Sequence, residues 1–557
     1  EGGYSAFRAD ITEKCTEEFN TIAIWCSNEK CDAIYPQSAD FTFYGGLYRG
    51  AHLICVPETH FELLHYGDLG IHAATEPASW DKEDFMLHIR TKICGVEKDN
   101  QVIYQIFDED GKEVASAARP ADSPDTSIPL YKPHRWDIKN SYQYTLKALI
   151  MRNNECLDEV ELKFGVRTFC CDPGRGFLIN GNCVPLRGVS RHQDKLYQGN
   201  ALTKEDHIRD AELIEEIGAN TVRLAHYQHA QEFYNECDKR GFVVWAEIPF
   251  ISVMNEDPLA HENCITQLKE LIYQNDHHPS ICFWGISNEI LIGGISEKLV
   301  ENHRELNALA KKIDPYRLTT IAHVTMTPKD GPMHEITDVE SYNHYFGWYG
   351  GDVSMYGDWF DNFHKKYPNK AIGMSEYGCE ALNWHTSNPE QGDYTEEYQA
   401  YYHEEVIKQI AKRPYMWATH VWNMFDFAAD ARAEGGENGM NHKGLVTFDR
   451  KYKKDSFYAY QAWLSKKPML HICGKRYVDR VEDVTKITVY TNLDEVELFA
   501  NGESVGKQKK GEFPFFYFEV KNEGETTLVA KAGELTDESK IKKVDKFNED
   551  YRLKEEG

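Results

Sequence analysis

The spacing of apolar residues changes along the chain, and between residues 171 and 465 it alternates between two patterns. Segments with a helical period, such as 203–217, are followed by short apolar runs such as "ANTVRLAHY". Thr203 and Asp206 form a capping-box pattern at the start of that helix, and Gly218 ends it. This alternation predicts a parallel (β/α)₈ barrel, a TIM barrel, rather than a doubly wound sheet.

Antiparallel β-structure is predicted on both sides of the barrel. In residues 58–170 and 466–557, strand-like runs are separated by turn signals such as "DEDGK". Several short strands at this spacing are typical of a β-sandwich of about 100 residues. Residues 1–57 contain short apolar runs such as "NTIAIWCS" and "AHLICVP", which predict short strands from the end of a further β-domain.

Composition and charge exclude partners more than they identify one. The chain has 557 residues, a formal net charge of −28 and a sequence pI near 5.3. This acidity argues against binding to nucleic acid or to an anionic membrane. No apolar run reaches the roughly 18 residues of a membrane-spanning helix. The fourteen cysteines form no CxxC pair, which predicts reduced, mostly buried thiols and a cytoplasmic location.

Polar side chains recur where the apolar runs of the predicted barrel end, which is where parallel barrels carry functional groups. In "HHPSICFWGISNEI" the apolar run ends in Asn288 and Glu289, and in "IGMSEYG" it ends in Glu376. The other run ends carry Arg223, His226, Glu247, His323, Tyr345, Trp422 and Asp426. A single charged strand end usually begins a solvated loop, but so many around one rim indicate a site.

The two glutamates of this rim indicate a reaction class. Paired carboxylates suit glycoside hydrolysis, because one acid can protonate the leaving oxygen while the other attacks the sugar or activates water. A metal site is the alternative for a rim rich in His, Glu and Asp. The sequence has no HExxH pattern, and no GxGxxG or GxxxxGK[ST] pattern that would indicate nucleotide binding.

Long stretches of the chain resemble glycoside hydrolase family 2. The stretches are "FLINGNCVPLRGVSRHQD", "GANTVRLAHYQHAQEFYNECDKRGFVVWAEIP", "HHPSICFWGISNE" and "IGMSEYG", together with "DFTFYGGLYR" near the start. The resemblance implies a partial jelly-roll sugar-binding domain at 1–57, immunoglobulin-like sandwiches at 58–170 and 466–557, and a catalytic barrel at 171–465. It also implies a carbohydrate substrate and a retaining exo-glycosidase mechanism.

The resemblance assigns roles to individual residues of the rim. Glu289 matches the general acid/base and Glu376 the nucleophile, so the two carboxyls should lie about 5–5.5 Å apart. Asn288 matches the residue that binds the sugar 2-hydroxyl. Tyr345 is similar to the tyrosine that donates to the nucleophile, although a tyrosine that packs the rim remains an alternative.

Further residues match substrate contacts of the family. Arg223 and His226 match rim positions that orient the nucleophile or bind sugar hydroxyls, and Trp422 matches the wall on which the sugar packs. Asp40 matches a loop aspartate that binds distal hydroxyls, with an aspartate that stabilises a turn as the alternative. His192 matches a sugar-binding position and equally fits a loop histidine with no role in binding.

The identity of the sugar is predicted less directly. The segment from "VWNMFDF" to "YAYQAW" resembles the β-galactosidases most, so hydrolysis of terminal β-D-galactosides is the expected activity. Asn441 and Lys443 match the Asn-x-Lys pattern with which β-glucuronidases bind a uronate carboxylate. A β-glucuronidase or β-galacturonidase is therefore the alternative, and a non-catalytic carbohydrate-binding protein on the same scaffold is a third. Lys443 also fits a solvated loop lysine.

No metal or other cofactor is expected. After Glu247 comes "IPFIS", without the histidine two residues on that belongs to the metal-ligand pattern of some β-galactosidases in the resembled family. The resemblance also implies that the protein could form homo-oligomers.

Overall fold

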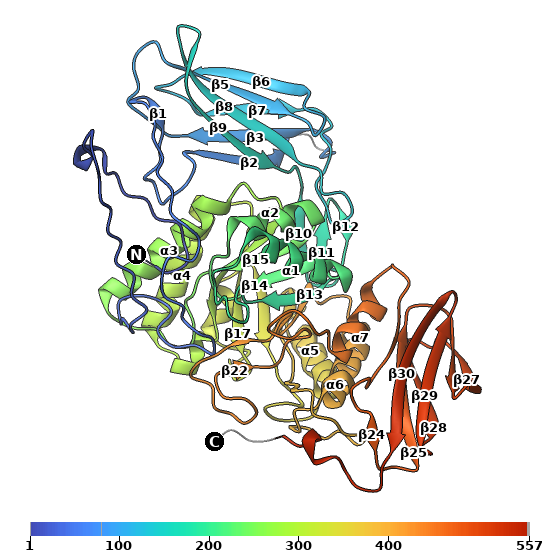
Figure 1. The fold of residues 1–557 in the computed structure, drawn as a ribbon. Helices are drawn as coiled ribbons and strands as arrows, with labels where there is room; N and C mark the ends of the chain where they lie inside the picture. Colours follow the sequence, from blue (N-terminus) through green and yellow to red (C-terminus); the bar gives the residue numbers. More distant parts are fainter. Residues whose placement is uncertain (1, 79–80, 554–557) are drawn as a thin grey trace. The chain divides into compact units, whose positions relative to one another are not determined.

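The computed structural model of the protein describes residues 2–78 and 81–553. The chain forms two compact units. The first unit consists of Glu1–Ala39, Phe43–Val184 and Leu224–Ser341, and the second of Asp40–Thr42, Pro185–Arg223 and Tyr342–Gly557. Each unit contains one β-sandwich and strands of the barrel, as the labels in Figure 1 show.

Eight strands close into the predicted barrel. They are β13 (Leu186–Arg191), β14 (Thr221–Leu224), β15 (Val243–Glu247), β16 (Ile281–Asn288), β17 (Leu318–Val324), β18 (Val339–Asn343), β19 (Ile372–Glu376) and β20 (Ala418–Val421). Almost all of their residues are buried, as the near-continuous apolar runs of a parallel barrel require. The fold class predicted from the sequence is therefore confirmed.

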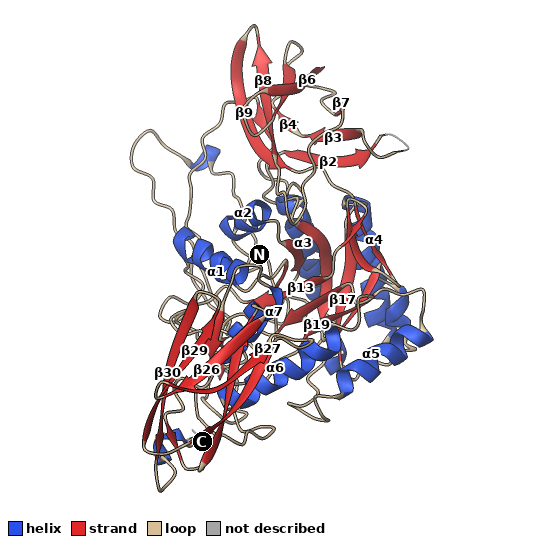
Figure 2. Ribbon diagram, turned by 90° about the vertical axis from the view of Figure 1, so that its right-hand side faces the viewer, coloured by secondary structure: helices blue, strands red, loops and turns tan. Residues whose placement is uncertain are grey.

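Helices alternate with these strands (Figure 2). They are α1 (Lys204–Glu216), α2 (Gln231–Arg240), α3 (Pro258–Asn275), α4 (Glu297–Ile313), α5 (Met355–Lys366), α6 (Glu396–Ile410) and α7 (Asp455–Leu464). The capping box of α1 is confirmed, because the Asp206 N–H donates to the Thr203 hydroxyl at 3.2 Å and the Thr203 N–H donates to the Asp206 carboxylate at 3.0 Å. No helix among the described residues is long and apolar enough to span a membrane.

The first sandwich packs two antiparallel sheets, in the orders β2-β3-β7 and β6-β5-β8-β9. Their strands are β2 (Ile71–Pro77), β3 (Phe85–Thr91), β5 (Gln101–Phe107), β6 (Glu113–Pro120), β7 (Thr126–Leu130), β8 (Tyr144–Arg152) and β9 (Glu155–Phe164). Along β3 and β8, buried residues alternate with partly exposed ones, so one face of each sheet forms the core. Short pairings flank this sandwich: β1 (His60–Phe61) with β4 (Ile93–Cys94), and β10 (Phe169–Asp172), β11 (Gly176–Ile179) and β12 (Asn182–Cys183).

The second sandwich follows the barrel in sequence and lies in the second unit. Its sheets have the orders β23-β25-β28 and β24-β30-β29-β26-β27. The strands are β23 (Leu470–Ile472), β24 (Asp479–Arg480), β25 (Val484–Thr491), β26 (Glu495–Ala500), β27 (Glu503–Lys509), β28 (Phe515–Lys521), β29 (Glu525–Ala532) and β30 (Leu535–Lys543). The strands predicted in both flanking regions are thus confirmed.

Residues 2–59 differ from the prediction. The structure describes a single 3₁₀ turn there, η1 (Thr12–Lys14), and no strand, so the short strands predicted for this segment were wrong. The side chains of Ile22, Trp25 and Leu53 are 61%, 93% and 71% exposed. An apolar run forms a strand only where a partner strand takes up its backbone hydrogen bonds, and these runs have none in the described chain.

The cysteines also depart from the prediction in part. None of the fourteen forms a disulfide, and all lie within the described residues. Five are buried and seven are exposed, four of the exposed ones being in residues 15–55. The expectation of mostly buried thiols was therefore wrong, because the first segment has no core to bury them.

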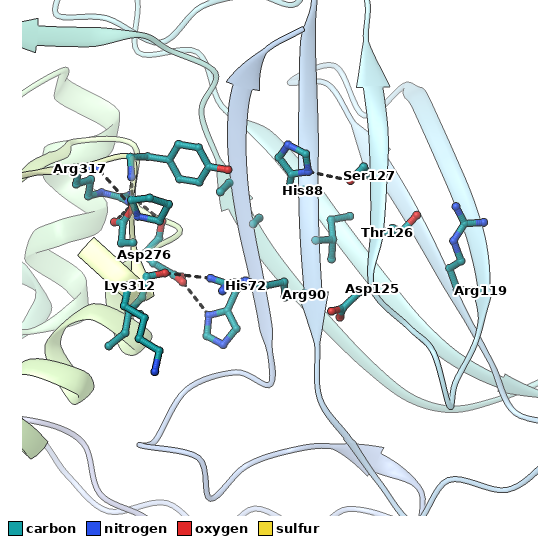
Figure 3. Close-up of a pocket in the computed structure, with 17 residues that line it drawn as sticks. His72, His88, Arg90, Arg119, Asp125, Thr126, Ser127, Asp276, Lys312 and Arg317 are labelled. Atoms are coloured by element: carbon teal, nitrogen blue, oxygen red, sulfur yellow. Dashed lines mark hydrogen bonds and ion pairs between the residues drawn. The ribbon is translucent and has the colours of Figure 1, made fainter. Parts of the chain in front are cut away.

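His72 joins the first sandwich to the end of α3, within the first unit (Figure 3). It lines a cavity of about 580 Å³ whose other walls come from β3, β7 and the chain after α4. Its two ring nitrogens lie 2.8 Å from Asp276 and 3.1 Å from Asp68. Burial opposes a charge on this ring, but the Asp276 and Asp68 carboxylates outweigh it and raise the pKa of His72 to about 9.

This raised pKa predicts a pH-dependent contribution to stability. The imidazolium form favours the folded state below the ordinary histidine pKa of about 6.5, and its contribution, roughly 3 kcal/mol at most, is lost as the pH rises through about 9. His72→Gln should therefore lower the unfolding midpoint strongly at pH 6 and little at pH 10. Thermal unfolding of both proteins measures this gap. His52→Gln, at an exposed position, is the control, and a gap that is constant with pH would contradict the prediction.

Candidate active site

Glu289 stands immediately after β16, at the carboxyl end of a fully buried barrel strand. Its backbone has φ +47° and ψ +26°, a left-handed conformation that non-glycine residues rarely adopt. Its N–H donates to the Ala322 carbonyl at 2.8 Å, which ties it to β17. Strained backbone of this kind concentrates at functional sites.

Glu376 is the last residue of β19, and its side chain is held by two donors of the second unit. The Arg223 guanidinium donates to Oε1 at 2.5 Å and the Tyr345 hydroxyl donates to Oε2 at 2.6 Å. Arg223 is fully buried and Glu376 is 4% exposed. A buried carboxylate whose two oxygens accept from a buried guanidinium and from a hydroxyl is fixed in orientation, as a nucleophile requires.

The predicted Asp40 and Asn441 meet in the second unit. Asn441 donates to Asp40 Oδ2 at 3.0 Å, and Arg432 donates to the same oxygen at 2.6 Å. The Thr42 N–H donates to the Ala428 carbonyl at 2.9 Å, which anchors the loop that carries Asp40. Asp40 is therefore held by side chains of the segment between β20 and α7, and its side chain remains 47% exposed.

Lys443 is 1% exposed and therefore not a solvated loop lysine. Its ammonium donates to the Tyr349 hydroxyl at 2.8 Å and to Glu380 at 3.2 Å. The ammonium nitrogen lies 5.7 Å from the ring centre of Tyr345, the same residue that donates to Glu376. The buried cation and the buried carboxylate thus share Tyr345 as a neighbour.

Tyr349 is placed to donate a hydrogen bond to a ligand. Its oxygen accepts from Lys443 at 2.8 Å and from Arg432 at 3.0 Å. A phenol oxygen has two lone pairs and one hydrogen. Since two cations occupy the lone pairs, the hydroxyl hydrogen points away from both of them.

Trp422 and His192 pack together on an aromatic wall in the second unit. The His192 ring lies edge-on to Trp422 at 5.3 Å and also packs on Phe41 and Phe427. The Arg223 guanidinium lies 5.9 Å from the Trp422 ring centre, which puts this wall beside the group that holds Glu376. The geometry of His192 fits a packed ring and leaves the predicted sugar contact untested.

The first unit contains further buried histidine–carboxylate pairs at strand ends. His226 Nδ1 lies 2.6 Å from Glu247, and both residues are buried. Glu340 Oε2 lies 2.9 Å from both His323 and His334, and these three residues could hold a metal ion. Their ligand atoms already contact one another through hydrogen bonds, so the arrangement is also satisfied as an ion-pair network.

Comparison with known proteins identifies the family. Residues 173–466 match the TIM-barrel domain of glycosyl hydrolases family 2, and residues 78–167 match a second model of the family. The chain belongs to glycosyl hydrolases family 2. Residues 482–536 of this family 2 chain match a domain of unknown function.

Two curated family 2 enzymes and one crystal structure are similar to this chain over most of its length. A β-glucuronidase of Bacteroides fragilis is 38% identical, over 91% of this chain and 75% of its own length. β-Galactosidase BoGH2A of Bacteroides ovatus is 25% identical, over 91% of this chain and 65% of its own. The crystal structure of an FMN-binding β-glucuronidase from Faecalibacterium prausnitzii, 51% identical, covers all of this chain and 86% of its own, with a TM-score of 0.95.

Three residues of this site were missed in the sequence: Tyr349, Glu380 and Arg432. Tyr349 lies four residues after Tyr345 in "SYNHYFGWYGG", where so many aromatic residues occur that none stands out. Glu380 lies four residues after Glu376, a spacing that could have drawn attention to it. Arg432 lies in a loop, and its side chain contacts residues at least 52 positions away, except for Glu434.

Tyr345→Phe tests the support of Glu376. The change removes the hydroxyl that donates to Oε2 of Glu376, so turnover of an aryl β-glycoside should fall about 10- to 100-fold. Steady-state kinetics measure the loss, and thermal unfolding checks that the fold is retained. Tyr401→Phe, on an exposed part of α6, is the matched control. Unchanged turnover in Tyr345→Phe would leave Tyr345 as a packing residue.

Proposed function

We propose that this family 2 chain is a retaining β-glucuronidase. The relatives that support this are two β-glucuronidases. One is 38% identical to this chain in sequence, and the other, whose crystal structure is known, is 51% identical in sequence. The β-galactosidase activity expected from the sequence has support from a relative at 25% identity. The β-glucuronidase alternative, in which Asn441 and Lys443 bind a uronate, is therefore better supported than the β-galactosidase activity.

The observation that carries the proposal is the buried ammonium of Lys443. Two of its three N–H groups donate to Tyr349 and Glu380, which leaves a third for a ligand. The Tyr349 hydroxyl hydrogen is directed away from Lys443 and Arg432. An ammonium, a phenol and the nearby Asn441 amide together suit a carboxylate, whereas a neutral hydroxymethyl group offers these donors one oxygen and no charge.

The proposed mechanism has two displacements. Glu289, as the acid, protonates the glycosidic oxygen while Glu376 Oε attacks the anomeric carbon, so the aglycone leaves as an alcohol and a glycosyl ester forms on Glu376. Glu289 then removes a proton from water, which attacks the same carbon and releases Glu376. Arg223 and Tyr345 stabilise the carboxylate before attack and as it is released.

The remaining predicted residues take binding roles in this proposal. Asn288 binds the sugar 2-hydroxyl, a contact that strengthens in the transition state. Trp422 provides the surface on which the apolar face of the sugar packs. Asp40 binds hydroxyls far from the reacting carbon, with His192 and His226 beside the sugar ring.

The substrate is tested by comparing turnover of p-nitrophenyl β-D-glucuronide and β-D-galactoside. The wild type should prefer the glucuronide, and Lys443→Gln should lower kcat/KM for the glucuronide by at least about 100-fold, because a desolvated charge pair with the substrate is lost. Turnover of the galactoside should change little. Lys451→Gln, at an exposed lysine of the same segment, is the control.

The outcomes of this comparison separate the candidate functions. Preference for the galactoside in the wild type would contradict the proposed sugar and would support the β-galactosidase activity expected from the sequence. Absence of turnover with both substrates, together with saturable binding of glucuronate, would support the non-catalytic carbohydrate-binding alternative.

Glu376→Gln tests the nucleophile. The amide cannot form the glycosyl ester, so turnover should fall by at least about 1,000-fold while glucuronate still binds. Proton NMR of the wild-type reaction should show the β-anomer as the first product, as a double displacement requires. Glu390→Gln, at an exposed loop position, is the control. Full activity in Glu376→Gln, or an α-anomer as first product, would overturn the assignment.

A further inference from the structure

Glu380 is a buried carboxylate to which neither the sequence analysis nor the proposed mechanism gives a role. It is 2% exposed and lies four residues after Glu376. Its Oε1 accepts from Lys443 at 3.2 Å and from Arg432, and its Oε2 accepts the His442 N–H at 3.2 Å. Three donors thus fix both oxygens of one side chain.

Lys443 depends on Glu380 for its charge. An ammonium that is 1% exposed is costly unless an anion lies next to it, and without one it gives up its proton. Glu380 is the carboxylate that forms an ion pair with Lys443 in the part of the chain that the structure describes. Burial opposes the charge on Lys443, but Tyr349 and Glu380 outweigh it and raise the pKa of Lys443.

The same contacts act on Glu380. Burial opposes its charge, but Lys443 and Arg432 outweigh it and lower the pKa of Glu380 to about 2. The charged and titratable groups around Lys443 include Glu380, Arg432, Tyr345, Tyr349, Cys379 and Tyr394. Arg432 also contacts the carboxylates of Asp40 and Glu434, whereas Lys443 forms its ion pair in the described chain with Glu380.

We propose that Glu380 is a positioning residue that holds Lys443 protonated and aimed at the sugar, and so makes the chain selective for sugars that carry a carboxylate. This rests on the proposed function. Glu380 touches no reacting atom, and it acts through Lys443. The prediction is that the charge of Glu380 matters for an anionic sugar and not for a neutral one.

Glu380→Gln tests this role, because the amide keeps the volume and one acceptor oxygen but removes the charge. KM for p-nitrophenyl β-D-glucuronide should rise at least 10-fold, with kcat changed less than 3-fold. The loss should grow as the pH rises, because Lys443 without this carboxylate gives up its proton more readily. Turnover of the β-D-galactoside should stay at its wild-type level at every pH.

Two further variants control for structural damage. Glu434→Gln removes a carboxylate that also contacts Arg432, at 3.0 Å, without touching Lys443, so its kinetics should remain those of the wild type. Glu380→Asp keeps the charge on a shorter side chain, and its glucuronide kinetics should lose the dependence on pH even if KM is raised. Unfolding midpoints of all variants are compared with the wild type.

The results distinguish the two proposals. If the wild type fails to prefer the glucuronide, the proposed function itself fails. If Lys443→Gln loses the glucuronide and Glu380→Gln does not, the role of Glu380 is refuted while the function stands. A pH-dependent loss of equal size in Glu380→Asp and Glu380→Gln would also refute it, since the charge would then not be the cause.

Discussion

The contacts of the buried Arg432 guanidinium determine the arrangement of the proposed sugar-binding residues in the second unit. It contacts Asp40, Glu380 and Tyr349 at once, and its side chain is 3% exposed. A planar group with five donors in a fixed fork can hold two carboxylates and a phenol in one arrangement, which a lysine cannot do. The loop with Asp40 and the partner of Lys443 are therefore set by one side chain.

Such a cluster is a poor way to stabilise a fold. Removing charges from water is costly, and well-packed apolar residues of the same volume often stabilise a protein equally well or better. What charges provide is a defined arrangement of donors. Lys443 keeps one N–H and Tyr349 keeps its hydroxyl hydrogen for a ligand because their other contacts are already made. The cluster therefore fits the proposed recognition of a sugar carboxylate better than a role in stabilising the fold.

The proposed nucleophile and the proposed acid are held in different ways. Glu376 is held by Arg223 and Tyr345, which fix its two oxygens. Glu289 instead follows an apolar strand and has a left-handed backbone tied to β17. Two carboxylates in unlike surroundings suit the two different roles of a retaining glycosidase, in which one must begin charged and the other neutral.

Features set by residues close together in the chain could be predicted from the sequence, and features set by residues far apart could not. The barrel and its two glutamates were predictable, because a strand end is defined by the local change from apolar to polar residues. Arg432 and Glu380 were not, since loops 52 residues apart in the chain bring them together. The prediction of strands in 1–57 was wrong for the converse reason. The apolar runs there have a local pattern typical of strands, but they have no partner strand in the described chain.

The net charge of −28 shows why bulk properties do not identify a ligand. An acidic surface repels an anionic sugar at long range, yet such repulsion is screened within about 8 Å at physiological ionic strength. A bound uronate would instead meet Lys443 and Arg432, whose side chains are 1% and 3% exposed and are screened much less. Asp40, Glu380 and Glu434 contact these two cations, so a substrate carboxylate would add a negative charge to a cluster that already has more carboxylates than cations. Its binding therefore has to come from directed hydrogen bonds rather than from an excess of positive charge, and selectivity then depends on where the ammonium points.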